Sequence, residues 1–136
     1  MPDIALSLKV AVADGPTWSI GHRLSVEAYD VIDLVIPPGT VDQLVELQPS
    51  AAARINLVAI QSSLYGAQIS FKTSGPGGDS SPVALLGPQL YGDGVATLFS
   101  VPPLSLKLSN QHPVAVPPAA PKNARIQILV GRNATP

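Results

Sequence analysis

Apolar and polar residues alternate along much of this chain, with the period of two that is typical of half-buried β-strands. Every second residue from Ile4 to Val12 is apolar, and polar residues such as Ser7 lie between them. The same period recurs in segments 67–73 (AQISFKT) and 104–110 (LSLKLSN). The inward residues predicted for these two segments are Ile69, Phe71, Thr73, Leu104, Leu106 and Leu108.

Two further segments predict strands from less regular patterns. Segment 24–36 (LSVEAYDVIDLVI) begins in phase, and we interpret a change near Tyr29 and Asp30 as a β-bulge, because one inserted residue exchanges the two faces. Segment 41–49 (VDQLVELQP) fits a short helix nearly as well as a strand. Its short length and the prolines on both sides favour the strand.

Segment 53–63 (ARINLVAIQSS) has an apolar centre, which predicts a strand buried on both faces, with Ile55, Leu57 and Ala59 inward. Segments 94–101 and 124–132 predict two more strands, and segment 82–92 is the least regular of all. No amphipathic helix is apparent.

The segments between these strands are rich in turn residues. The segment ADGPTWSIGHR, residues 13–23, is interpreted as a turn region, and HPVAVPPAAPKN, residues 112–123, as a Pro-rich arm or a long crossover. Seven to nine short strands joined in this way predict an all-β fold, with residues 1–136 as a single domain. The expected architecture is an antiparallel β-sandwich, similar to a jelly roll, because two sheets bury each other's apolar faces.

Charged residues are scarce, at 12% of the chain against about 25% in an average domain, while 46% of residues are hydrophobic. A compact monomer of 14.0 kDa exposes roughly 6,700 Å², so each charge must solvate about 400 Å². Plentiful Ser, Thr, Asn, Gln and Gly residues offer one explanation. We favour the other, a homo-oligomeric or assembly interface that covers part of this surface.

The composition argues against several classes of partner and site. A net charge of −1 with scattered Lys and Arg residues argues against nucleic acid, and no apolar run approaches the roughly 20 residues that cross a membrane. We expect no signal peptide from the first residues, which carry an acid before the apolar stretch. The absence of cysteine excludes disulfides and thiolate metal sites.

The segment SGPGGDSSP, residues 74–82, raises the question of a phosphate-binding loop. Such a loop needs converging backbone N–H groups at a helix N-terminus and usually a lysine, and this segment has neither. Pro76 lacks a donor, and Asp79 carries the wrong charge. The glycines instead suit a hairpin or interstrand turn, which can contact a neighbouring subunit.

No catalytic or metal site is predicted. His22 and His112 lack metal-ligand spacing, no serine lies in a nucleophile elbow, and the aspartates lack the dense spacing of calcium loops. We therefore expect no enzymatic activity and no cofactor.

Exposed aromatic residues are candidates for contacts with partners. Trp18, in the expected turn region, is either a core residue or an interface anchor, and Tyr91 lies next to a turn. The candidate interface residues are Trp18, Gly75, Pro76, Gly77, Gly78, Asp79 and Tyr91.

In the order of its segments LVAIQSSLYGAQISFKTS, GDGVATLFSV, LSLKLSN and ARIQILVGRNA, the chain resembles small virion structural proteins of tailed bacteriophages, in particular the capsid decoration or cement class. The resemblance covers roughly the C-terminal two thirds. It implies a small β-rich protein, usually trimeric on the shell, that contacts the major capsid protein or another virion protein. Assembly in the host cytoplasm and localisation in the virion would follow.

Two other functions agree with the same composition. The chain could be a tail, neck or fibre component of such a particle, or a ligand-binding or adhesion module. Whether the N-terminal strand lies in the core or is an arm exchanged with a neighbour also stays open at this point.

Overall fold

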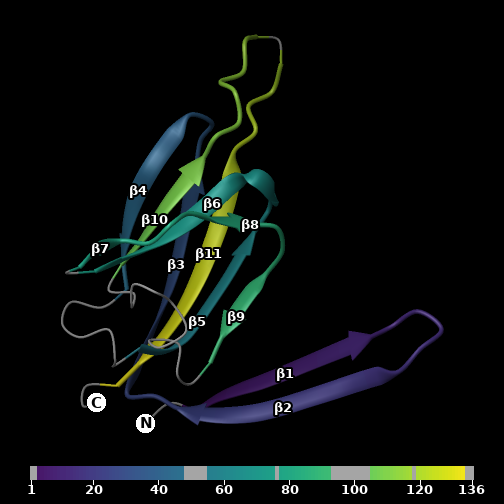
Figure 1. The fold of residues 1–136 in the computed structure, drawn as a ribbon. Coiled ribbons are helices and arrows are strands. Elements are labelled where there is room, and N and C mark those ends of the chain that lie inside the picture. Colours follow the sequence, from purple (N-terminus) through teal and green to yellow (C-terminus); the bar gives the residue numbers. More distant parts are fainter. Residues whose placement is uncertain (1–2, 48–54, 76, 93–104, 118, 134–136) are drawn as a thin grey trace.

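The computed structural model describes residues 3–47, 55–75, 77–92, 105–117 and 119–133. These residues form an all-β fold without a helix, in which antiparallel sheets pack together (Figure 1). The strands are β1 (Asp3–Ala11), β2 (Thr17–Ser25), β3 (Ala28–Ile36), β4 (Thr40–Glu46), β5 (Ile55–Ser62), β6 (Gly66–Gly75), β7 (Gly78–Asp79), β8 (Val83–Leu85), β9 (Gln89–Tyr91), β10 (Ser105–Asn110) and β11 (Ala124–Arg132).

Two sheets form the body of the protein, as the predicted sandwich requires. One has the order β4-β10-β6-β7, with β8 also paired to β6, and the other has the order β3-β11-β5-β9. Their facing surfaces enclose one apolar core. Its most buried side chains include Phe71, Leu106 and Leu108 from the first sheet, and Ile60, Ile126 and Ile128 from the second.

Two of the alternating segments, those that form β6 and β10, fold as predicted. Ile69, Phe71 and Thr73 of β6 are at most 1% exposed, and Leu106 and Leu108 of β10 are 2% and 1% exposed. Segment 41–49 contributes the strand β4, not a helix. Leu104 and the predicted strand 94–101 lie outside the described residues.

The predicted bulge near Tyr29 and Asp30 is wrong. Strand β3 pairs with β11 without a register shift from Ala28 to Ile36. Segment 24–36 changes its surroundings because it is not one strand: β2 ends at Ser25, and β3 begins at Ala28 in another sheet.

A register shift occurs instead where β4 pairs with β10, between Leu108 and Asn110. On the β4 side, Asp42 has a φ of 53°, and its backbone N–H donates to the Ser109 hydroxyl at 3.0 Å. This local hydrogen bond stabilises a left-handed conformation that is uncommon for residues other than glycine.

Asn110 connects the two sheets at one end of the core. Its fully buried amide nitrogen donates to the carbonyl oxygens of Ile36, at 2.9 Å, and Lys122, at 2.8 Å. Its Oδ1 accepts a hydrogen bond from the backbone N–H of His112. The sequence pattern places this residue at the end of a strand but gives no sign of this role.

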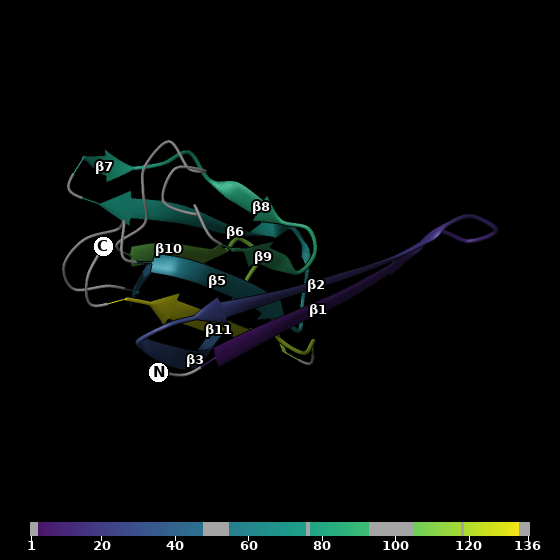
Figure 2. The same ribbon diagram turned by 90° about the horizontal axis from the view of Figure 1, so that it is seen from below.

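The predicted turn region 13–23 is also wrong, apart from its first residues. Residues from Thr17 onward form β2, which pairs with β1 in a separate two-stranded sheet from Asp3↔Ser25 to Ala11↔Thr17. Figures 1 and 2 show this hairpin leaving the sandwich, with its tip clear of both sheets. The turn itself includes Asp14, whose φ is 58°.

Candidate interaction surface

The β1–β2 hairpin has one apolar face. Directly opposed residues of an antiparallel pair project to the same side, so the pairs along the hairpin define its two faces. One face, here called the hairpin apolar face, consists of Ile4, Leu6, Leu8 and Val10 from β1 with Trp18, Ile20, His22 and Leu24 from β2. The other face carries Ser7, Lys9, Ser19, Gly21 and Arg23, among others.

The base of the hairpin is packed against the sheet β3-β11-β5-β9. Leu24 and Val26 are 3% and 0% exposed. At Gly131 of β11, an added Cβ would lie 3.0 Å from Val26 Cγ1, 3.2 Å from Leu57 Cβ and 3.4 Å from Ile4 Cδ1. The glycine therefore permits a close approach that a side chain would obstruct.

The distal half of the hairpin apolar face is open to solvent. Trp18 is 65% exposed, and its partner Val10 and the next pair, Leu8 and Ile20, are each more than two fifths exposed. An isolated two-stranded hairpin is marginally stable in water, and this one exposes the face that would normally lie against a core. Trp18 is thus an exposed strand residue, neither a core residue nor part of a turn.

A second apolar surface lies on the outside of the sheet β3-β11-β5-β9. Val31, Leu129, Ala59 and Leu90 are directly opposed from strand to strand, so they form a row across all four strands. We call these four residues the apolar row. Val31 is 66% exposed, and Leu90 is 47% exposed. The apolar row and Leu8 of the hairpin line a cleft of about 630 Å³.

Polar side chains next to this row are paired with one another. Asp33 accepts hydrogen bonds from Arg125 Nη2, at 2.7 Å, and from Gln127 Nε2, at 3.3 Å. Gln127 in turn accepts a hydrogen bond from Gln61 at 2.7 Å. The Arg125 guanidinium, helped by Gln127, holds the pKa of the Asp33 carboxyl below its usual value. The apolar row is therefore bordered by polar groups without an isolated charge among them.

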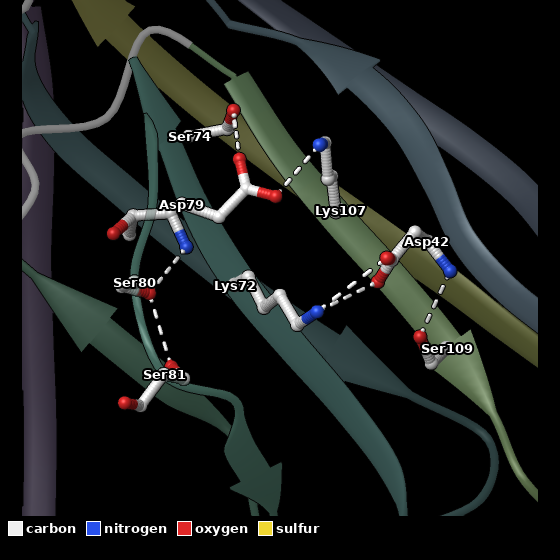
Figure 3. Close-up of polar contacts among 9 residues, drawn as sticks. Asp42, Lys72, Ser74, Asp79, Ser80, Ser81, Lys107 and Ser109 are labelled. Atoms are coloured by element: carbon white, nitrogen blue, oxygen red, sulfur yellow. Dashed lines mark hydrogen bonds and ion pairs between the residues drawn. The ribbon is translucent and has the colours of Figure 1, made fainter. Parts of the chain in front are cut away.

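The outer surface of the other sheet is different in character (Figure 3). Lys72 and Lys107 are directly opposed on β6 and β10, and each reaches across the strand of the other lysine to an aspartate, Lys72 to Asp42 of β4 and Lys107 to Asp79 of β7. Lys107 Nζ lies 2.7 Å from Asp79 Oδ2, and Lys72 Nζ lies 3.3 Å from Asp42 Oδ1. The sandwich thus has a charged outer face and an apolar one, and the hairpin points its apolar side toward the apolar one.

The Gly-rich segment forms a turn, as predicted. Ser74 pairs with Asp79 and Gly75 with Gly78, which joins β6 to β7, and Gly78 has a φ of 110°. Asp79 is held in place by Lys107 and by the Ser74 hydroxyl, which donates to its Oδ1 at 2.7 Å. Gly77 is exposed, and Pro76 lies outside the described residues.

Tyr91, the other aromatic candidate, is partly buried against the core. Its hydroxyl donates to Gln89 Oε1 at 2.7 Å, and burial raises its pKa. The predicted interface residues do not form one patch: Trp18 lies on the hairpin, Tyr91 on β9, and the Gly-rich turn on the other sheet.

The apolar row was not predicted from the sequence, although the sequence contains a signal for it. Strands β3, β5 and β11 contain the runs VI, LVAI and ILV, in which apolar residues occupy both faces. Such a run indicates a strand covered on both sides. Burial on both faces was predicted for segment 53–63 but not for the segments that form the neighbouring strands β3 and β11.

Within the described part of the chain, no group of three or more His, Cys, Asp or Glu side chains is arranged to hold a metal ion. His22 lies on the hairpin and His112 in the segment after β10. The described residues also contain no helix long and apolar enough to cross a membrane. Comparison of the chain with protein-family models, curated proteins and solved structures finds no match.

Proposed function

We propose that this chain is a non-enzymatic structural protein that forms homo-oligomers, with a trimer favoured, and stabilises a larger particle. The particle we propose is a virion, with the chain bound as a decoration protein to the major capsid protein or another virion protein. The observation that carries the proposal is that the β1–β2 hairpin projects from the sandwich and leaves the distal half of the hairpin apolar face exposed to solvent.

Three features support this role. A face of Val10, Trp18 and Ile20 is costly to leave in water, so burial of this face favours association. The low charge content reduces the cost of covering the surface around it. The order of the chain's segments also resembles that of capsid decoration proteins.

Native mass spectrometry and sedimentation velocity at 1 to 100 µM, on the order of typical subunit affinities, test the assembly role. We expect trimers that dissociate on dilution, with a melting temperature that falls at low concentration. A monomer at 100 µM that also fails to co-sediment with capsids would contradict the proposal.

A second candidate function is supported by the cleft of about 630 Å³, which is in the size range of small-molecule sites and is lined mainly by apolar residues. In this case the protein would be a ligand-binding module for an apolar molecule. Saturable binding of an apolar fluorescent probe, lost in Leu129→Asp but kept in Leu44→Asp on the other sheet, would favour it.

A further inference from the structure

The protein exposes more surface than a compact chain of its size. Its accessible surface is 7902 Å², whereas a compact monomer of 14.0 kDa exposes roughly 6,700 Å². The difference, on the order of 1,000 Å², is similar to the roughly 800 Å² that each partner buries in a standard protein complex. The projecting hairpin is one feature that adds such surface (Figure 2).

The hairpin cannot cover its own sheet with its distal half. Its base is fixed by the buried residues Leu24 and Val26, and from there it diverges from the sheet until its tip is clear of the sandwich. Of the hairpin residues, Leu8 alone lines the cleft with the apolar row. Trp18 and Val10, further out, face solvent, and the apolar row remains exposed.

We propose that the distal hairpin apolar face of one copy docks on the apolar row of a second copy. This inference rests on the proposed assembly role and names the contact that would produce it. The docking residues are Val10, Trp18 and Ile20 on one copy, and Val31, Leu90 and Leu129 on the other.

Stoichiometry favours a second copy over a different protein. Within the described residues, each chain carries one projecting hairpin and one apolar row, so a single repeated contact covers both surfaces on every subunit. Such a head-to-tail contact closes into a ring when its rotation permits, and a trimer is one such ring. The exposed parts of the docking residues Val10, Trp18 and Ile20 amount to on the order of 300 Å², a substantial part of the roughly 800 Å² that one partner contributes to a standard interface.

The charges around both surfaces permit this contact. Asp33, which lies on the same face of the sheet as the apolar row, is already paired with Arg125, so covering the row leaves neither of these two charges without a partner. On the hairpin, Lys9 and Arg23 project from the opposite face. The arrangement matches the apolar centre and polar rim of a protein interface.

The test uses single-cysteine variants, because the chain has no cysteine of its own. A tagged chain with Ile20→Cys is co-expressed with an untagged chain with Val31→Cys and treated with a short bismaleimide. We expect a covalent heterodimer. The matched control is Ser19→Cys with Val31→Cys, because Ser19 adjoins Ile20 but lies on the other face of the hairpin; we expect its yield to be at least fivefold lower.

Three results would overturn the inference in distinguishable ways. An oligomer without preferential cross-linking from Ile20→Cys would exclude this docking and leave the assembly role intact. Cross-linking of Ile20→Cys chains to one another would show hairpin-to-hairpin packing instead. A wild-type monomer at about 100 µM would exclude the docking and the homo-oligomeric part of the proposed function, and a monomer that also fails to co-sediment with capsids would exclude the proposed function as a whole.

Discussion

Replacing Gly131 with alanine should destabilise the protein, because this position lets the hairpin base approach the sheet. The new Cβ would lie 3.0 Å from Val26 Cγ1 and 3.2 Å from Leu57 Cβ, closer than ordinary van der Waals contact. Leu57 is the directly opposed residue on β5, so its Cβ cannot rotate away from the contact. The neighbouring strands or the hairpin base must move.

The magnitude follows from two opposing effects. Overpacking a well-filled site costs about 1 to 3 kcal/mol. Alanine also restricts the unfolded chain, which offsets about 0.4 to 1 kcal/mol of this cost. We therefore expect Gly131→Ala to lower the free energy of unfolding by about 0.5 to 2 kcal/mol. Urea denaturation at a single protein concentration measures the change.

Gly87→Ala is the matched control. A Cβ at Gly87 meets no atom within 4 Å, and no left-handed φ is found there, so this variant should be unchanged or slightly more stable. Adding Val26→Ala to Gly131→Ala removes one of the close contacts, so the two substitutions should cost less together than the sum of their separate effects. Equal stability of Gly131→Ala and Gly87→Ala would refute the close-packing argument.

The remaining predictions concern the hairpin, an ion pair and a buried amide. Trp18→Ser should change the stability of the isolated subunit little, since the side chain is 65% exposed, but should weaken self-association by about 2 kcal/mol, or roughly 30-fold, in sedimentation equilibrium. Hydrogen bonds from Lys107 and Ser74 hold the pKa of Asp79 below its ordinary 3.8. The Asp79 carboxylate therefore stabilises the fold above about pH 4, and this contribution is lost as pH falls through the lowered pKa. In Asp79→Asn, the free energy of unfolding should depend less on pH in this acidic range. Asp79 raises the pKa of Lys107 above its ordinary 10.5, so the lysine's contribution is present below that pH and is lost as pH rises through the raised pKa. Asn110→Ala should cost about 2 to 3 kcal/mol in urea denaturation, because it leaves the buried carbonyl of Ile36 without its donor, and an unchanged midpoint would contradict this role.

Local alternation was sufficient to predict most of the sandwich. Segment 67–73 became β6 with Ile69 and Phe71 inward, and the Gly-rich turn formed where glycine and proline interrupt the pattern. These features depend on neighbouring residues: a period of two separates the faces of any strand, and glycine supplies the turn geometry.

The interaction surface was predicted only in part. Trp18 was identified as a candidate because a tryptophan in an expected turn region is either a core residue or an interface anchor. Its strand and its apolar neighbours were not identified, since Gly15, Pro16 and Gly21 suggested a continuous turn. Gly21 instead lies within β2, opposite Ser7 on the polar face of the hairpin, where the lack of a side chain removes few packing contacts.

The sequence by itself determined which residues can share a face of a strand, and that only 12% of the residues are charged. Only the tertiary structure decided what each face meets. Ile4 and Trp18 belong to the same hairpin face, yet one packs on β11 while the other lies in solvent, because the hairpin diverges from the sheet along its length. Val31 likewise becomes part of an apolar row through strands distant in sequence. Alternation is a local property, whereas burial depends on which distant segment lies above a residue.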